Sequence, residues 1–262
     1  MRIGVYQFLP EFGEKEKNLN KIEQTIKNVN SDLVVLPELC TTGYQFISQD
    51  EVGGFCEEIP GDSTIDRFVS LCKDKKLYLV AGIGERDGDV CYNTSVLIGP
   101  DGYIGKYRKV HLFFEEKNWF KPGDLGFPVW DIGPAKIGMM ICFDWVYPEA
   151  VRSLALQGAD IICHPVNLVL PYCQQAMITR SIENGVFIVT ANRIGSEQRG
   201  GKDKLTFTGS SQITGPRGDV FFRLGENVES YQEVEIDPSQ ARNKKLTPYN
   251  DLLNDRRPDQ YF

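Results

Sequence analysis

The chain has 262 residues, of which 41% are hydrophobic, 25% charged and 11% aromatic. This is the composition of a globular protein, and it excludes a mostly disordered chain, a collagen or a coiled coil. The net charge of −7 argues against a nucleic-acid surface. The apolar stretches 77–83 and 160–170 are far shorter than the ~20 residues of a membrane span, and the N-terminus does not resemble a signal peptide. We therefore expect a cytoplasmic protein with no nucleic-acid or membrane partner.

In chain order, hydrophobic periodicity predicts a single domain of alternating strands and helices. A strand at 3–8 precedes a helix carrying Leu19, Ile22 and Ile26 on one face, and a short buried strand follows at 33–36. A second helix begins at Asp62. Further strands are expected at 77–85, 90–98, 103–110, 136–142, 160–164, 186–192, 207–214, 219–223 and 231–236, with helices from 147 and at 173–184. This order favours stacked layers of helices and sheets, with the irregular tail 241–262 lying along a surface or a partner subunit.

The cysteine and histidine content argues against metal and redox chemistry. The seven cysteines form no CxxC pair, and only two histidines occur, at positions 111 and 164. Zinc ribbons, thioredoxin-type pairs and a Ser-His-Asp triad are therefore disfavoured. We expect no metal, no other cofactor, and reduced thiols.

Three segments place a reactive side chain at the end of a predicted strand. Glu38 directly follows a buried strand, where a carboxylate is costly unless it is paired; it could instead be a capping or solvent-facing acid. Lys109 shares a strand face with Tyr103 and Tyr107, whereas Lys106 and Arg108 are expected on the opposite, solvent-facing side. The alternative for these cations is a basic strand edge that resists aggregation.

Cys142 lies where a strand of small and apolar residues turns into a helix that begins with Pro148. Such a corner presents a side chain near backbone N–H groups, as a nucleophile elbow does. A free thiol is mostly protonated at neutral pH and needs a base or a positive neighbour to react. Lys109 could supply the charge and Glu38 the base; the alternative is a buried structural thiol.

The segments LPELCTTGY, YRKVHLF and CFDWVYPE resemble, in this order and spacing, the three signature segments of the nitrilase superfamily of carbon–nitrogen hydrolases. Further segments extend the resemblance over essentially the whole chain. It implies a single-domain four-layer α-β-β-α sandwich over 1–262, a homodimer or larger homo-oligomer, and a tail that reaches the subunit interface. It also places the nucleophile on Cys142, the general base on Glu38, the lysine on Lys109 and an additional glutamate on Glu116, with Glu115 as the alternative.

The resemblance further implies hydrolysis of a small aliphatic amide or nitrile through a Cys142 thioester, without a cofactor. Glu38 would move the protons, while Lys109 and the backbone N–H of Phe143 would stabilise the developing negative charge. The substrate-binding residues by family position are Tyr44, Phe113, Trp119, Phe143, Asp144, Trp145 and Asn167, with Leu168 and Tyr172 nearby. Arg180 and Arg193 are the only candidates for binding a substrate carboxylate.

Three alternatives remain open from the sequence. The first is hydrolysis of an N-carbamoyl amide, which would release carbon dioxide, ammonia and an amine. The second is a catalytically silent binding or scaffold protein, and the third is a metal-dependent amidohydrolase.

Overall fold

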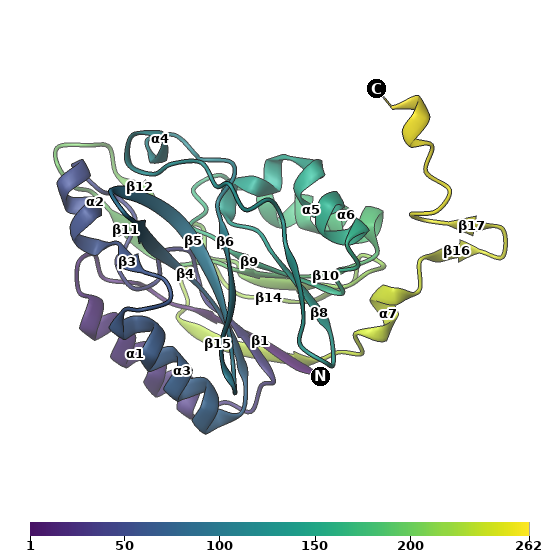
Figure 1. The fold of residues 1–262 in the computed structure, drawn as a ribbon, viewed down its shortest axis with the longest axis horizontal. Coiled ribbons are helices and arrows are strands. Elements are labelled where there is room, and N and C mark those ends of the chain that lie inside the picture. The colour runs from purple at the N-terminus through teal and green to yellow at the C-terminus, as the bar shows by residue number, and fades with distance from the viewer. Residues whose placement is uncertain (262) are drawn as a thin grey trace.

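The computed structural model describes residues 1–261, which form two β-sheets packed face to face (Figure 1). The first sheet has the strand order β15-β1-β2-β4-β5-β6, with β3 paired to β4. The second has the order β14-β13-β10-β9-β8-β7. The first sheet comprises β1 (Arg2–Gln7), β2 (Leu33–Val35), β3 (Glu57–Glu58), β4 (Tyr78–Asp87), β5 (Val90–Gly99), β6 (Gly102–Arg108) and β15 (Ser230–Glu235). The second comprises β7 (Val129–Asp131), β8 (Lys136–Met139), β9 (Ile161–Pro165), β10 (Phe187–Ala191), β13 (Gln212–Thr214) and β14 (Val220–Arg223).

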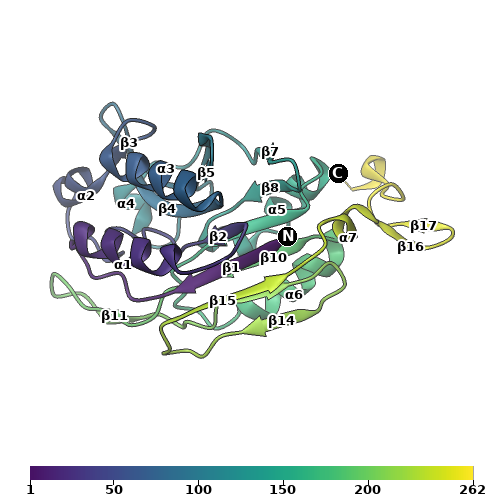
Figure 2. The same ribbon diagram turned by 90° about the horizontal axis from the view of Figure 1, so that it is seen from below.

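Helices cover the outer face of each sheet (Figure 2). On the first sheet lie α1 (Lys15–Lys27) and α3 (Ser63–Lys75), and on the second lie α5 (Pro148–Leu156) and α6 (Cys173–Asn184). The arrangement is the expected four-layer α-β-β-α sandwich. The remaining elements are α2 (Gln49–Phe55), α4 (Glu116–Trp119), the 3-10 turns η1 (Cys142–Val146) and η2 (Pro258–Gln260), α7 (Ser239–Arg242), and the pairs β11 (Ser196–Glu197) with β12 (Leu205–Thr206) and β16 (Lys245–Thr247) with β17 (Asn250–Asp251).

The apolar core lies in two layers, as the sandwich requires. Between the sheets, inward-facing residues of the central strands, such as Val5, Val35 and Val80, pack against those of β8, β9 and β10. Outside the first sheet, Leu19, Ile22 and Ile26 of α1 join a second cluster under the helices. The parallel central strands β1, β2 and β4 are buried over most of their length, and β2 is an uninterrupted apolar run, as is typical of strands covered on both faces.

The face of β6 opposite Tyr107 is not the solvated surface that the sequence suggested. Arg108 is 5% exposed and donates to both oxygens of the buried Glu85, while Lys106 donates to Glu85 and to the Ile59 carbonyl. The expectation of solvent-facing cations at 106 and 108 was wrong, because Glu85 on β4 supplies a buried counter-charge across the sheet.

Candidate active site

Glu38 lies where the chain leaves β2, completely buried. The next residue, Leu39, has a φ of +47°, so the chain turns sharply at this point. The turn lies directly against β4: a Cβ at Gly82 would come 2.5 Å from the Glu38 Cα and 2.9 Å from the Leu39 nitrogen. Only glycine at position 82 allows this close approach, so β4 fixes the position of the Glu38 backbone.

Two donors from neighbouring strands bind the Glu38 carboxylate. The Asn93 amide on β5 donates to Oε1 over 2.6 Å, and the Lys109 Nζ, just beyond β6, donates to the same oxygen over 2.7 Å. Among the described residues, the second oxygen, Oε2, has no hydrogen-bond partner. The carboxylate is therefore held by one oxygen and presents the other as a free acceptor.

The Lys109 ammonium also donates to Oε1 of Glu116 over 2.7 Å. Glu116 begins the short helix α4, and the Tyr44 hydroxyl donates to the same oxygen, also over 2.7 Å. The neighbouring Glu115 points elsewhere and pairs with Lys202. The sequence indicated Glu116 or Glu115 as the additional glutamate near the lysine, and in the structure Glu116 is the one that contacts Lys109.

Cys142 follows β8 and begins the 3-10 turn η1, with a φ of +40° that side chains rarely adopt. The His164 ring on β9 contacts the Cys142 carbonyl through Nε2 at 3.0 Å. Burial lowers the pKa of His164 to about 4, so a neutral ring donates this hydrogen bond at ordinary pH. The buried His164 imidazole thus stabilises the turn at Cys142 through its hydrogen bond to the Cys142 carbonyl.

Burial and the neighbouring charges, including that of Glu38, shift the pKa values of Cys142, Lys109 and Glu116. Burial and the negative charge of Glu38 raise the pKa of the Cys142 thiol, and the positive charge of Lys109 opposes that shift. Burial alone would lower the pKa of Lys109, but Glu116 and Glu38 raise it above its ordinary value. Burial raises the pKa of Glu116 to about 7, against the influence of Lys109. The resting site is therefore a protonated thiol beside a lysinium ion that two carboxyl groups share.

A narrow cavity of about 10 Å³ lies over the Cys142 side chain. It is lined by Phe113, Cys142, Phe143, Trp145, Asn167, Leu168, Val169 and Leu170. Asn167 is the one polar side chain besides the thiol. It is 2% exposed, and among the described residues neither its Nδ2 nor its Oδ1 has a partner. The walls around the thiol are therefore mainly apolar, and they offer one amide for hydrogen bonding.

Asp144 does not line this cavity, although it was expected to bind substrate. Its Oδ1 accepts from the His111 backbone, and the His111 ring lies 2.7 Å from the same oxygen. Its Oδ2 accepts from the Tyr107 hydroxyl and from the Ile141 backbone. Since these contacts occupy both oxygens of a buried carboxylate, Asp144 holds the turn that carries Cys142.

Other expected substrate residues do not line the Cys142 cavity. Trp119 lines a separate cavity of about 20 Å³, together with Tyr44 and Glu116. Tyr172 is 63% exposed, and Arg180 pairs with Glu183. Arg193 is buried, pairs with Glu197 and stacks on Phe207. Neither arginine lines the Cys142 cavity.

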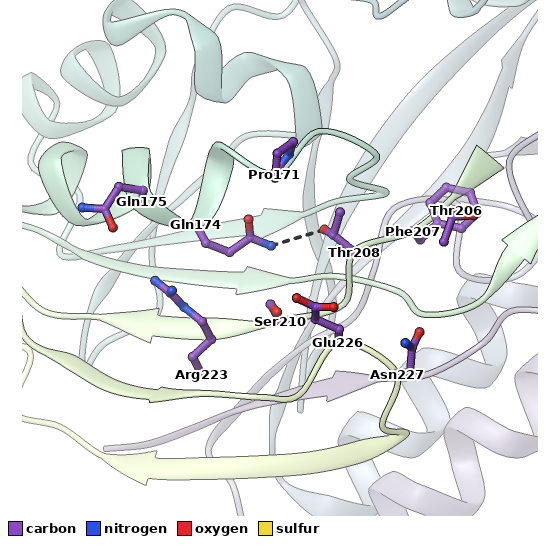
Figure 3. Close-up of a pocket in the computed structure, with 10 residues that line it drawn as sticks. All are labelled: Pro171, Gln174, Gln175, Thr206, Phe207, Thr208, Ser210, Arg223, Glu226 and Asn227. Carbon is purple, nitrogen blue, oxygen red and sulfur yellow. Dashed lines mark hydrogen bonds between the residues drawn. The ribbon is translucent and has the colours of Figure 1, made fainter.

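A further cavity, of about 450 Å³, has none of the residues of the Cys142 cavity in its lining (Figure 3). Its lining includes Gln174, Arg223 and Glu226 from α6, β14 and the segment after β14. The Thr208 backbone N–H donates to the Leu168 carbonyl, so a lining residue of this cavity is hydrogen-bonded to a lining residue of the Cys142 cavity.

Sequence reasoning missed Asn93 and Gly82, which position Glu38. A buried asparagine in a strand is costly unless it is hydrogen-bonded, and a glycine in a strand suggests a close approach by another part of the backbone. These two patterns could have identified Asn93 and Gly82 as unusual positions, but they do not indicate that both contact Glu38.

Between Met1 and Tyr261, no group of three or more His, Cys, Asp or Glu side chains is arranged to hold a metal ion. Over the same residues, no helix is long and apolar enough to span a bilayer.

Comparisons with known proteins show the family of the chain. The family model described as carbon-nitrogen hydrolase matches residues 2–245. A protein named nitrilase from Pyrococcus abyssi is 46% identical, with 100% of this chain and 99% of that protein covered. An N-carbamoylputrescine amidase from Solanum lycopersicum is 31% identical over 88% of this chain and 83% of its own length. The solved structure of a carbon-nitrogen hydrolase from Helicobacter pylori superposes with a TM-score of 0.90 at 28% identity, covering 100% of this chain and 97% of that one. The protein is therefore a member of the carbon–nitrogen hydrolase family.

Proposed function

We propose that this hydrolase cleaves the carbon–nitrogen bond of a small, uncharged aliphatic amide or nitrile through a thioester on Cys142. The observation that carries the proposal is the buried set of Cys142, Glu38 and Lys109, with Glu116 as a second carboxyl group on the lysine. A buried ion pair of this kind is expensive to maintain for stability alone. Its position beside a thiol on a strained turn supports a chemical role.

The proposed reaction starts with proton transfer from the Cys142 thiol to Glu38, whose Oε2 is free to accept it. The sulfur attacks the amide carbonyl or nitrile carbon, and the negative charge that develops there is stabilised by Lys109 and by the backbone N–H of Phe143. One such donor contributes roughly 3–4 kcal/mol in comparable sites. With an amide, Glu38 then protonates the departing nitrogen, ammonia leaves, and the same carboxylate activates the water that hydrolyses the thioester. With a nitrile, the first adduct is a thioimidate, so one water adds to it before ammonia leaves and the thioester forms, and a second water hydrolyses the thioester.

The shape of the cavity supports the substrate class. Its walls are apolar, and no charged side chain is among the residues that line it. A substrate whose side chain carried an ammonium or carboxylate against these walls would lose its hydration without gaining a partner among the lining residues. We therefore propose a short aliphatic chain next to the scissile group, with Asn167 donating to or accepting from the substrate.

A second candidate is hydrolysis of an N-carbamoyl amide, which the similarity to the amidase from Solanum lycopersicum supports. Product analysis separates the two. Ammonia and a carboxylate in equal amounts support the first candidate, whereas carbon dioxide and an amine support the second. The experiment is a panel of short aliphatic amides, nitriles and N-carbamoyl amines with all products quantified.

The Cys142→Ala variant tests the nucleophile directly. We expect no turnover on any substrate that the unmodified enzyme cleaves, with an unchanged melting temperature in the variant. Undiminished hydrolysis in the folded variant would overturn the proposal. Turnover that survives this substitution but is lost on metal chelation would instead favour the metal-dependent alternative.

A further inference from the structure

We propose that Cys56 and Cys91 form a second thiol site, which closes to a reversible disulfide and acts on the segment that carries Lys109 and Glu116. Cys56 ends α2, Cys91 lies near the start of β5, and both are free thiols in the structure. They belong to one apolar cluster with Leu39, Phe46, Val52, Leu112 and Phe120.

Strand register brings the two residues together. Residue 91 pairs with Arg86 across the β4–β5 hairpin, and Glu57 pairs with Glu85 across β3 and β4. Cys56 lies above β4 at Gly84, where an added Cβ would come 3.1 Å from the Cys56 sulfur. Because Gly84 has no side chain, Cys56 can lie over the same inner face of the sheet from which Cys91 projects.

The surroundings make one of the two thiols more acidic than the other. The neighbouring Cys56 thiol lowers the pKa of Cys91, whereas Cys91 and burial raise the pKa of Cys56; the nearby positive charge of Arg86 lowers the pKa of both. Arg86 is fixed there by its hydrogen bond of 2.8 Å to the Cys56 carbonyl. An acidic thiol beside a second thiol is the arrangement that undergoes disulfide exchange.

Cys56 is 3% exposed and Cys91 is 5% exposed, and the tip of the β4–β5 hairpin, residues 86–89, is exposed next to Cys91 in the chain. The remaining cysteines differ. Burial raises the pKa of Cys40, Cys72, Cys163 and Cys173.

The pair is linked to the candidate active site through the backbone of β5. The Cys91 carbonyl accepts from the Lys121 backbone over 2.9 Å, and the Asn93 carbonyl accepts from the Lys109 backbone over 2.8 Å. Both ends of the segment 109–121, which contains Glu116, are thus held by this part of β5. Drawing the two sulfurs to a bond length of about 2.05 Å would shift that support, and misplacement of about 1 Å can reduce catalysis ~100-fold.

The chemistry balances with a small disulfide such as oxidised glutathione as the oxidant. The Cys91 thiolate attacks one sulfur of glutathione disulfide and releases one glutathione thiolate. The Cys56 sulfur, after losing its proton, attacks the Cys91 sulfur and releases the second. The two protein thiols lose two electrons and two protons, and the oxidant becomes two glutathione thiols.

The first test counts thiols in the Cys142→Ala background, so that the proposed nucleophile does not contribute. After equilibration with oxidised glutathione and acid quench, we expect loss of two of the six remaining thiols and a peptide linking residues 56 and 91 by mass spectrometry. Adding Cys56→Ala or Cys91→Ala should abolish the linked peptide, while Cys72→Ala, the matched buried control, should retain it. Absence of the linked peptide, or linkage of other cysteines, overturns the site.

The second test measures kcat/KM of the otherwise unmodified enzyme before and after oxidation. We expect at least a tenfold loss that dithiothreitol restores, and no such loss when the Cys91→Ala variant is treated in the same way. An unchanged rate in protein that carries the linkage overturns the connection to the active site. This readout rests on the proposed function, whereas the thiol count does not, so the two can fail separately.

Discussion

At the scale of single residues, the candidate site is a small number of charges whose states depend on burial. Glu38, Lys109 and Glu116 share two short contacts with almost no exposure to solvent. In such surroundings the two carboxyl groups raise the pKa of Lys109, and the charge of Lys109 opposes the effect of burial on the pKa of Glu116.

Glu116 gives a testable pH dependence of stability. Its pKa in the folded chain is raised to about 7 from an ordinary value of 4.5, so the folded state holds its proton more tightly than the unfolded state does. This contribution is complete below about pH 4.5 and is lost as the pH rises through 7. Relative to Glu116→Gln, which cannot titrate, the free energy of unfolding should fall by about 3 kcal/mol between pH 4 and 8. Urea unfolding across this range measures the difference, and parallel curves for the two proteins would contradict the assignment.

Asn93 is expected to position Glu38. Hydrogen bonds to charged groups contribute about 1.5–3 kcal/mol, so Asn93→Ala should reduce kcat/KM roughly 10- to 100-fold and shift the pH–rate profile. Asn28→Ala, which removes an exposed amide at the end of α1, is the matched control and should leave both unchanged. A rate loss without a shift in the profile would indicate a merely structural role.

At the scale of elements, the close contact between β4 and the Glu38 turn should tolerate no side chain. Gly82→Ala would place a Cβ 2.5 Å from a backbone atom that cannot rotate away. We expect destabilisation by about 1–3 kcal/mol and loss of most activity. Gly54→Ala in α2 is the control, because an added Cβ there meets nothing within 4 Å. Equal melting temperatures of the two variants would show that the contact is looser than described.

The elements that hydrophobic periodicity predicted were largely found, and the helix expected at 173–184 has those bounds. The short elements α2, α4 and η1 were missed, since seven or fewer residues carry too little periodicity to identify. Two further features were missed for another reason. Asp144 accepts hydrogen bonds that hold the turn instead of lining the cavity, and the cations at 106 and 108 pair with a buried carboxylate. Their partners, Tyr107 and Glu85, are distant in sequence, and only the folded sheet brings them together.

At the scale of the whole molecule, the hairpin of β16 and β17 projects from the sandwich (Figure 1), whereas Arg256 and Tyr261 line a cavity together with Arg152 and Glu183 of α5 and α6. The hairpin carries Tyr249, which is 92% exposed, and Leu246, which is 55% exposed. Apolar and aromatic side chains held out from the body of a protein are typical of a contact with another chain. The expectation of a subunit interface at 241–262 therefore stays a prediction with a direct test.

Deleting residues 246–262 should reduce the oligomeric mass measured by light scattering, while the sandwich stays folded. The deletion leaves Arg242 and its ion pair with Asp160 in place, as well as the Lys244 contacts with the end of α6. An unchanged mass would show that the tail does not contribute to assembly.

The sequence resemblance predicted the layers of the sandwich and the set of charged groups at the site, because short motifs at strand ends carry both. It predicted the cavity lining only in part. Four of the expected residues, Phe113, Phe143, Trp145 and Asn167, lie there, whereas Tyr44, Asp144 and Trp119 do not. Whether an expected residue lines the cavity depends on the direction of its side chain after turns such as the one at Cys142. Sequence spacing does not encode that direction.

The most direct test of the account is to trap the enzyme during turnover. A short aliphatic amide is mixed with the enzyme, the reaction is quenched with acid within milliseconds to seconds, and the peptides are examined by mass spectrometry. The account predicts an added acyl mass on the peptide containing Cys142 and on no other cysteine. Turnover with no adduct at Cys142, or with the acyl group on another residue, would contradict it.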